Sequence, residues 1–307
     1  MSTGAVRADR ADDQVVVGVD GSEQATTAVR WATREAARRG TTLRVVHAWV
    51  WPLYRISLDP APGAPPGAGL RAVAEQVLAD AVRTARDTDS RVEVDTELVV
   101  GEPATALLRA VETAGLLVVG NRGVGGFGGL LLGSTGVSAS ARARCPVVVV
   151  RGDVDRGVSD GGTAPVVVGV DGTASGIDED AVLSAAVEQA ARRRAPLLLV
   201  HAWTAPLHRR RLEAGGYSAA AEEGIAAGRE ILRRAEEAVL REHPALTVRC
   251  RIGARSASAE LVDASREARL LVVGSSGAGP LTGLLLGSTT HAVIHHADCP
   301  VLVHRGG

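Results

Sequence analysis

Two glycine-rich segments of the chain have the residue types and the spacing to bind a phosphate group. Each starts with an apolar run ending in glycine, has a second glycine three positions later, and has a Gly-Ser-Thr triplet ten positions beyond that. The residues are Gly120, Gly123, Gly133, Ser134 and Thr135, and then Gly274, Gly277, Gly287, Ser288 and Thr289, each pair separated by 274 − 120 = 154 positions. Glycines let backbone N–H groups approach an anion, and a Gly-Ser-Thr triplet before a helix leaves N–H donors for a phosphate. The alternative is that the two segments are flexible connectors, but connectors would not require the same spacing of glycines in both.

An aspartate followed by glycine occurs near the start of each half. VVVGVDGS covers residues 15–22 and VVVGVDGT covers residues 166–173, so Asp20 corresponds to Asp171 and Ser22 to Thr173. The carboxylate could contact a ligand, or it could fix the Asp-Gly turn and cap the next helix. These roles are compatible, and the sequence leaves both open.

These residues follow predicted strands of an α/β unit that occurs twice. Short β-branched runs alternate with amphipathic segments in the order β-α-β-α-β-α-β-loop-α-β. This alternation predicts a parallel sheet with helices on both faces, whose ligands bind at the carboxyl ends of the strands. We therefore expect a disordered N-terminus at 1–13, a domain at 14–151, a linker at 152–164 and a second domain at 165–305, with third strands at about 92–99 and 246–252.

Composition excludes several classes of protein. All 34 Lys+Arg residues are arginine, so neither a Walker A loop nor Schiff-base chemistry is available. The net charge of −1 favours neither nucleic acid nor an anionic membrane. No apolar run approaches the roughly 20 residues that span a bilayer, and the polar N-terminus does not resemble a signal peptide. Cys145, Cys250 and Cys299 form no CxxC pair and are predicted to be buried, reduced thiols of a cytosolic protein.

The histidines and one arginine run are given structural interpretations. His47 and His201 flank apolar strands and are predicted to be core or hydrogen-bonding residues. The cluster His291, His295 and His296 resembles a metal site, but the first half has Val137, Ala141 and Arg142 at these positions. We therefore predict a solvated helix face there. The run at 209–211 is predicted to face solvent; folding over a triphosphate or contacting a partner are the alternatives.

The spacing Gly-x2-Gly-x9-Gly-Ser after a fourth strand, with Asp-Gly-Ser after the first, resembles the ATP-binding class of universal stress proteins. The resemblance covers nearly the whole chain as two tandem modules. It implies that each module is a Rossmann-like (adenine nucleotide alpha hydrolase-like) domain with a five-stranded parallel sheet of order 3-2-1-4-5. It also implies that Asp20 and Asp171 contact the nucleotide near its adenosine part, and that Ala48 and Ala202 meet adenine through backbone groups.

The same resemblance assigns the ribose and phosphates to the two glycine-rich segments. The predicted nucleotide-binding set therefore contains the ten residues named first, together with Asp20, Ser22, Ala48, Asn121, Arg122, Asp171, Thr173, Ala202, Ser275 and Ser276. The halves differ in two places. Gly101-Glu102-Pro103 matches a Gly-x-Pro turn common in the family, whereas the second half has Gly253-Ala254-Arg255. Arg122 could add a charged phosphate contact that Ser276 cannot, so we expect tighter binding in the first half.

The main hypothesis is a cytoplasmic, nucleotide-responsive regulator that binds up to two ATP molecules, with or without Mg²⁺. ADP, AMP and cyclic AMP are alternative ligands. One aspartate, backbone donors and hydroxyls are few groups for rapid phosphoryl transfer. Slow ATP hydrolysis or autophosphorylation, with Ser134, Thr135, Ser288 or Thr289 as acceptor, is the enzymatic alternative, and a nucleotide-free interaction scaffold is the third. The modules are predicted to pair through their last strands, and whole chains could dimerise further.

Overall fold

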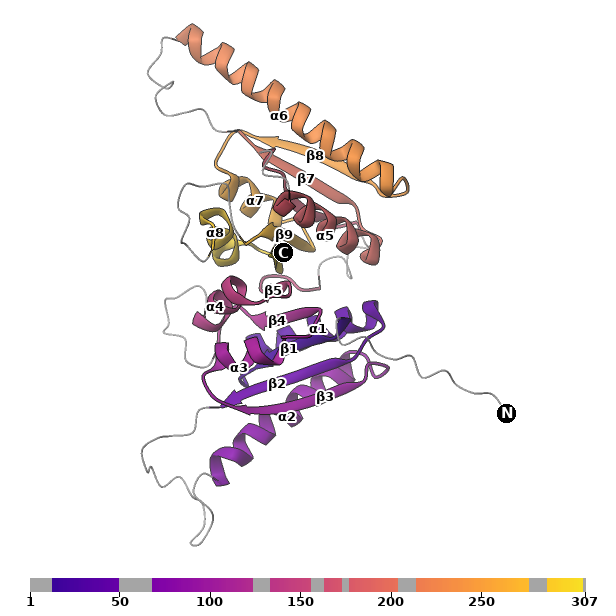
Figure 1. Ribbon diagram of the computed structural model, residues 1–307, viewed down its shortest axis with the longest axis vertical. Coiled ribbons are helices and arrows are strands. Elements are labelled where there is room, and N and C mark those ends of the chain that lie inside the picture. The colour runs from indigo at the N-terminus through magenta and orange to yellow at the C-terminus, as the bar shows by residue number, and fades with distance from the viewer. Residues whose placement is uncertain are drawn as a thin grey trace, which may run out of the picture. The chain divides into compact units, whose positions relative to one another are not determined.

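The computed structural model describes residues 13–49, 68–123, 133–155, 163–172, 177–203, 214–275 and 286–305. They form two compact units, Met1–Val150 (unit 1) and Arg151–Gly307 (unit 2), each an α/β domain (Figure 1). The predicted disordered segment lies outside the described residues except for Asp13, and so does the arginine run at 209–211.

In its described residues, unit 1 has five strands and four helices. Their bounds are β1 (Val15–Val19), α1 (Glu23–Arg39), β2 (Leu43–Trp49), α2 (Ala68–Thr88), β3 (Val94–Val100), α3 (Pro103–Ala110), β4 (Leu116–Gly120), α4 (Ser134–Arg142) and β5 (Val147–Val150). All strand pairs are parallel, in the order β3-β2-β1-β4-β5. The predicted 3-2-1-4-5 order is therefore confirmed for this unit.

Unit 2 repeats the same plan. Its described elements are β6 (Val166–Gly169), α5 (Ile177–Arg193), β7 (Leu197–Ala202), α6 (Ala214–Glu242), β8 (Val248–Gly253), α7 (Ala257–Ser265), β9 (Leu270–Gly274), α8 (Ser288–His296) and β10 (Val301–His304). The strands are parallel in the order β8-β7-β6-β9-β10, which is again 3-2-1-4-5 within the unit.

The helices pack in pairs on the two faces of each sheet. In unit 1, α1 packs against α2, and α3 packs against α4 (Figure 1). The chain moves from β1 to β3 in one direction and then returns to β4 and β5, so right-handed crossovers place the two helix pairs on opposite faces. The central strands are consequently covered on both sides. Val15, Val16, Leu116 and Leu117 have no exposed surface, as expected for continuous apolar runs in a parallel sheet.

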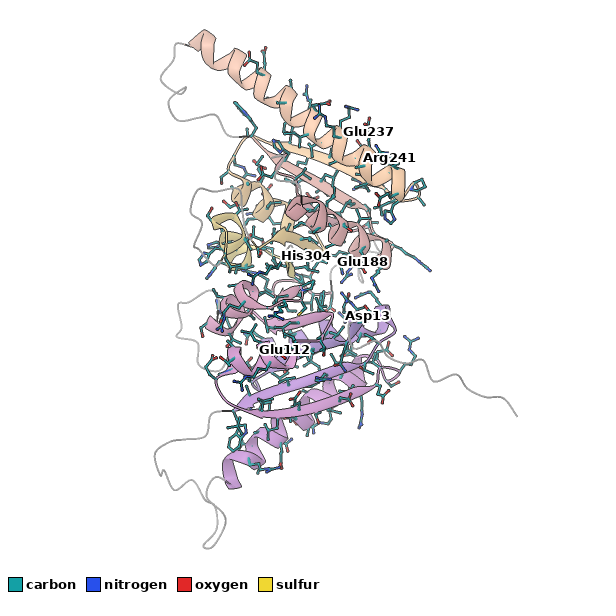
Figure 2. The ribbon with its side chains drawn as sticks, viewed as in Figure 1. Asp13, Glu112, Glu188, Glu237, Arg241 and His304 are labelled. Carbon is teal, nitrogen blue, oxygen red and sulfur yellow. The ribbon has the colours of Figure 1, made fainter. Side chains whose placement is uncertain are left out.

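Helix α1 has the start and stop signals expected from its sequence. The Ser22 hydroxyl caps it by accepting the Ala25 N–H at 3.1 Å, and Gly40 ends it in the left-handed region at φ 66°. The long helix α6 is amphipathic. Its Leu232 and Val239 are buried, whereas Glu237 and Arg241 are exposed along it (Figure 2).

The structure corrects one prediction about the cysteines. Cys145 and Cys299 are buried, but Cys250 is exposed because it lies on β8, the edge strand of unit 2. Burial raises the pKa of Cys145 to about 11, which keeps this thiol protonated. The third strand of unit 1 also begins two residues later than predicted, at Val94. None of the described helices combines the length and apolar content that crossing a bilayer requires.

Candidate functional site

The candidate site of unit 1 lies where the strand order reverses, between β1 and β4. These neighbouring strands pair Val15 with Leu116 and Val17 with Val118, so their carboxyl ends reach the same edge of the sheet. Asp20 follows β1 directly, and Gly120 ends β4. Such a switch point is the usual ligand-binding position of a doubly wound sheet. Unit 2 has the same arrangement between β6 and β9.

Asp20 holds the Asp-Gly turn and lies against the glycine-rich segment. Its Oδ1 accepts the Ser22 N–H at 3.0 Å, and Gly21 occupies the left-handed region at φ 85°. The turn interpretation is thus confirmed, while the helix cap belongs to Ser22. A Cβ atom at Gly123 would lie 2.3 Å from Asp20 Oδ2. A side chain at this position would require the Asp20 carboxylate to shift, so the structure brings the two sequence motifs into close contact.

The base of each glycine-rich loop is closed by the same pair of backbone hydrogen bonds. In unit 1 the Asn121 N–H donates to Val150 O at 3.0 Å, and the Gly133 N–H donates to Asn121 O at 2.8 Å. In unit 2 Ser275 donates to His304 O, and Gly287 donates to Ser275 O, both at 2.9 Å. These bonds position Gly133 and Gly287 beside the ends of β4 and β9. Residues 124–132 and 276–285, which include Ser276 and Gly277, lie outside the described residues.

Helices α4 and α8 begin at these closed bases without a side-chain cap. Gly133 and Gly287 are the N-cap residues, and among the residues that the structure describes no side-chain hydrogen bond caps either helix. Neither first turn contains an acidic residue. The N1 residues Ser134 and Ser288 are exposed, and Thr135 and Thr289 are partly exposed. The first N–H groups and the positive end of the helix dipole are therefore available to an anion.

The second strand brings its residues to the same edge. His47 lies opposite Val19 in the sheet, and its Nδ1 is 2.7 Å from Val19 O; His201 Nδ1 is likewise 2.7 Å from Val170 O. A ring nitrogen facing a carbonyl must donate, so both histidines are hydrogen-bonding residues, as predicted. Ala48 follows His47 and thus lies beside Asp20 at the strand ends. Ala202 ends β7 in the matching position.

Asp171 differs from Asp20 in its surroundings. It is exposed, whereas Asp20 is partly buried, and α5 begins only at Ile177. Gly172 is again left-handed, at φ 74°. Thr173, the expected counterpart of Ser22, lies outside the described residues. The described residues of unit 2 therefore repeat the loop base and helix start of unit 1 at Gly287, Ser288 and Thr289, and only part of the aspartate turn.

The turn after the third strand is built differently in the two units. In unit 1, Glu102 caps α3 by accepting the N–H groups of Thr105 (2.8 Å) and Ala104 (3.0 Å), and these bonds lower the pKa of Glu102. In unit 2 the N-cap is Ser256, which corresponds to Glu102 at the constant offset (256 − 102 = 154). The replaced Gly-x-Pro motif thus changes the cap and leaves the helix start in place.

Unit 2 adds an ion pair that the sequence analysis missed. Arg255 Nε lies 2.9 Å from Glu260 Oε1, and the Glu260 carboxylate is nearly buried although its residue type predicts exposure. The hydrogen bond from Arg255 lowers the pKa of Glu260 and is the largest cause of that shift. The separation of five residues is not a usual helical pairing, so no periodic signal could have identified the pair.

The histidines of α8 are only partly solvated. His291 and His296 are exposed, as predicted, but His295 is half-buried and its ring lies 4.4 Å from that of His291. Burial, followed by the nearby charges of His291, His296 and Arg151, lowers the pKa of His295. Within the described ranges, no group of three or more His, Cys, Asp or Glu residues is arranged to hold a metal ion.

The fold and these paired sites define a tandem duplication of a doubly wound, Rossmann-like α/β domain. The universal stress protein family model matches residues 13–151 and 163–305, and the chain belongs to this family. Universal stress protein Rv2005c of Mycobacterium tuberculosis is 35% identical over 300 residues, covering 95% of this chain and 96% of that protein. Universal stress protein Rv2623 of the same organism is 32% identical over 297 residues and likewise covers 95% and 96%.

Solved structures agree with the fold. The crystal structure of a universal stress protein from Archaeoglobus fulgidus superposes with a TM-score of 0.69 at 19% identity and covers 96% of this chain and 97% of its own. The tandem α/β architecture predicted from the sequence is therefore shown both by the family match and by structural likeness.

Proposed function

We propose that each unit binds one adenine nucleotide, with ATP as the expected ligand, and that the protein is a nucleotide-responsive regulator of the cytoplasm. The binding domains would span 14–151 and 165–305, with a linker at 152–164. The observation that carries this proposal is the repeated, uncapped helix N-terminus behind a hydrogen-bonded loop base. Two such sites at two switch points, with the same donors, favour an anionic ligand in each unit.

The phosphates are assigned to the N-terminal ends of α4 and α8. N–H groups at Ser134 and Thr135, and at Ser288 and Thr289, would donate to phosphate oxygens, with the hydroxyls beside them. Support for this fit comes from the first turns, which have no acidic side chain to repel a phosphate. The adenosine part would lie toward Asp20 and Ala48, at the ends of β1 and β2, and toward Asp171 and Ala202 in unit 2.

Mg²⁺ fits this site as a companion of ATP. Magnesium is usually held by one or two carboxylates, several waters and the phosphates of the nucleotide, without a protein cage. In the described part of unit 1, Asp20 is the carboxylate adjacent to the glycine-rich segment, and its Oδ1 already accepts the Ser22 N–H. This donor set supports binding of a nucleotide better than it supports rapid phosphoryl transfer, which requires metal ligands and a positioned nucleophile.

The proposal is tested by placing a carboxylate at each N-cap. Gly133 has ordinary extended angles (φ −73°, ψ 146°), and among the described residues a Cβ there would meet no atom closer than 3.8 Å. Aspartate is a preferred N-cap residue, so Gly133→Asp keeps α4 folded while its charge repels phosphate. Gly287→Asp does the same in unit 2, where Gly287 has φ −62° and ψ 150°.

Isothermal titration with ATP should show two sites in the wild type, one in each single variant and none in the double variant. Gly133→Ala is the matched control, because it adds the same Cβ without the charge and should leave both sites intact. Unchanged ATP binding by the double variant would overturn the proposal. Binding of ADP, AMP and cyclic AMP in the same titrations would rank the ligands.

Dimerisation of whole chains stays a separate prediction, which light scattering tests.

A further inference from the structure

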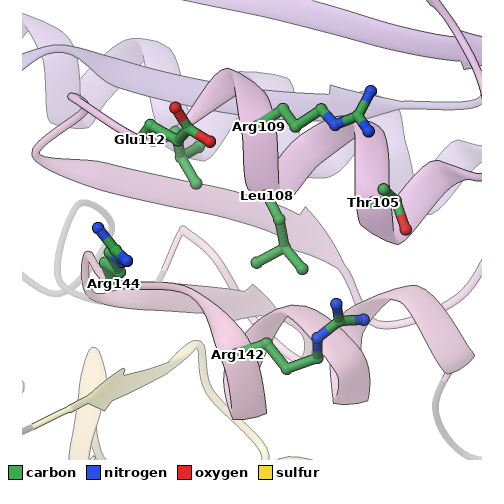
Figure 3. Close-up of a pocket in the computed structure, with 7 residues that line it drawn as sticks. Thr105, Leu108, Arg109, Glu112, Arg142 and Arg144 are labelled. Carbon is green, nitrogen blue, oxygen red and sulfur yellow. The ribbon is translucent and has the colours of Figure 1, made fainter.

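A second, separate pocket lies in unit 1 between α3 and the end of α4. It has a volume of about 410 Å³, and its lining includes Thr105, Leu108, Arg109, Glu112, Arg142 and Arg144 (Figure 3). Arg142 is the last residue of α4, whereas the proposed nucleotide phosphates lie at its first residue, Ser134. Eight residues of α-helix separate these positions by about 12 Å. The pocket is thus distinct from the candidate nucleotide site.

The lining of this pocket is strongly basic. Three arginines face one carboxylate, Glu112, and in the described part of the chain none of the three is ion-paired. Figure 3 shows Arg109 and Thr105 projecting from α3 and Arg142 from α4 at one end of the pocket, with Arg144 and Glu112 at the other. Outside this lining, the charge of Arg142 acts on the carboxylate of Glu102. Its pKa is lowered mainly by the N–H groups of Thr105 and Ala104, and the charge of Arg142 contributes last.

Unit 2 shows that the fold does not require this charge. At the constant offset, Arg109, Glu112, Arg142 and Arg144 become Asp263, Arg266, His296 and Asp298 (263 − 109 = 154). Three of the four positions reverse sign. The unit 2 residues neutralise one another: Arg266 lies 3.2 Å from Asp263 and 3.7 Å from Asp298, and Arg255 lies 3.4 Å from Asp263. The same surface is self-paired in unit 2 and unpaired in unit 1.

We propose that the unit 1 pocket binds a small anion bearing a phosphate group. Arginine guanidinium groups bind phosphate through paired, charge-assisted hydrogen bonds, and Arg109 and Arg142 present two of them from different helices. The Thr105 side chain adds a hydroxyl at the same end. Leu108 supplies apolar surface for the rest of a ligand, and the volume falls in the range of small-molecule sites, about 300–1,000 Å³. Unpaired arginines held around a pocket are expected to recruit an anion that satisfies them.

The experiment uses pyrophosphate as the probe and the full chain carrying Gly133→Asp and Gly287→Asp, which blocks the proposed nucleotide sites. Isothermal titration should show saturable binding at one site. Replacing the lining with its unit 2 counterparts (Arg109→Asp, Glu112→Arg, Arg142→His and Arg144→Asp) should weaken that binding about tenfold or more. This set should fold because it supplies the counterparts of Arg266 and of its two partners, Asp263 and Asp298. Arg109→Ala with Arg142→Ala is a second variant that removes the guanidinium groups without adding charge.

The matched control is Arg86→Asp, which makes the same charge change as Arg109→Asp on the exposed surface of α2. Binding that persists in both pocket variants, or that Arg86→Asp weakens equally, would overturn the proposal. Absence of pyrophosphate binding to the blocked chain would overturn it as well. ATP titration of the same proteins reports separately on the nucleotide sites, so failure of one proposal is distinguishable from failure of the other.

Discussion

The two units share the backbone geometry of the loop base and helix start, and they differ in the residues around it. In both, a backbone hydrogen bond closes the loop base at 2.8–2.9 Å, and an uncapped helix starts directly behind it. The aspartate side differs. Asp20 lies in a described, hydrogen-bonded turn next to Ser22, whereas Asp171 is exposed and is followed by three additional residues before its helix. Backbone geometry is thus repeated where a phosphate would bind, and side chains vary around it.

The two units also differ at the packed helix pair α3 and α4 of unit 1 and its counterpart in unit 2, α7 and α8. Unit 1 keeps Glu102 as a charged cap and, within its described residues, leaves Arg109, Arg142 and Arg144 without an ion pair around a pocket. Unit 2 caps α7 with a neutral serine and pairs Arg255 and Arg266 with neighbouring carboxylates. A duplicated domain can therefore retain one fold while one copy keeps charge available for a ligand and the other uses it for internal ion pairs.

The largest effect is expected from alanine at the left-handed glycine of unit 2. Gly21 and Gly172 both have positive φ, which costs an alanine about 1–2 kcal/mol. At Gly21 the added Cβ would meet Val77 Cγ2 at 3.2 Å, but at Gly172 it would lie 2.4–2.8 Å from three atoms of Ile231. Overpacking adds about 1–3 kcal/mol, so Gly172→Ala should destabilise its unit by about 3 kcal/mol and Gly21→Ala by about half as much.

Hydrogen exchange followed by mass spectrometry measures this difference because peptides from β1 and β6 report on each unit separately. Gly40→Ala is a useful control, since Gly40 is also left-handed but a Cβ there would meet no atom within 4 Å. It should resemble Gly21→Ala. Equal losses in Gly21→Ala and Gly172→Ala would show that α6 moves away from Gly172 at little cost, and the packing difference between the units would then carry no weight.

The second prediction concerns the two helix caps. Glu102→Ala and Ser256→Ala should each cost about 1 kcal/mol at pH 7, the usual value of a lost N-cap. Because its hydrogen bonds lower the pKa of Glu102, the stabilisation by this cap is present above the ordinary carboxyl pKa of 4.5 and is lost as the pH falls through the lowered value. The Ser256 cap does not titrate. Urea unfolding at pH 7 and in acid should therefore show a shrinking effect for Glu102→Ala and a constant one for Ser256→Ala.

Much of this architecture follows from patterns in the sequence. Runs such as Val15–Val19 are continuously apolar because their strands are covered on both faces, and this local signal was sufficient to order the elements. The repeat at a fixed offset then located the strand ends and the glycine-rich segments. Gly123 was predicted as a ligand-binding residue, and the structure adds a physical reason for glycine there: its close approach to Asp20.

Side-chain partners could not be predicted in this way. Glu35 of α1 is fully buried because Arg39 pairs with it at 2.9 Å, and Glu260 is nearly buried against Arg255. A charged residue ordinarily predicts exposure, so only the tertiary packing shows that these two are inside. Cys250 is exposed because the order of strands places β8 at an edge, which the cysteine itself does not indicate. The arginine pocket joins side chains of two consecutive helices, α3 and α4, whose approach to each other depends on the tertiary packing.

The third prediction exchanges the charged residue beside the first loop. In the Gly287→Asp background, where only the unit 1 site is expected to remain, Arg122→Ser should weaken ATP binding by about two- to fivefold. The effect is modest because Arg122 is exposed, and exposed charge pairs contribute about 0.2–1 kcal/mol. Ser276→Arg in the Gly133→Asp background should strengthen binding to unit 2 by a similar factor. Both changes in ATP affinity should diminish as the salt concentration increases. Equal ATP affinities of the two wild-type units would contradict the expected asymmetry.

The smallest effect is expected at His295, which unit 1 replaces with Ala141. Burial holds the pKa of His295 below the ordinary 6.5, and the positive charges of His291, His296 and Arg151 nearby act in the same direction. As the pH falls, His295 therefore takes up a proton at a higher pH in the unfolded chain than in the folded chain. The free energy of unfolding consequently decreases as the pH falls from above 6.5 toward the lowered pKa of the folded chain. His295→Ala should flatten the dependence of unit 2 stability on pH between 7 and 5, whatever it costs in packing. Exposed His243, changed to alanine, is the control and should leave that slope as it is. If the pH dependence of unit 2 stability is unchanged in His295→Ala, other groups cause the acid sensitivity. His295 would then not distinguish α8 from α4.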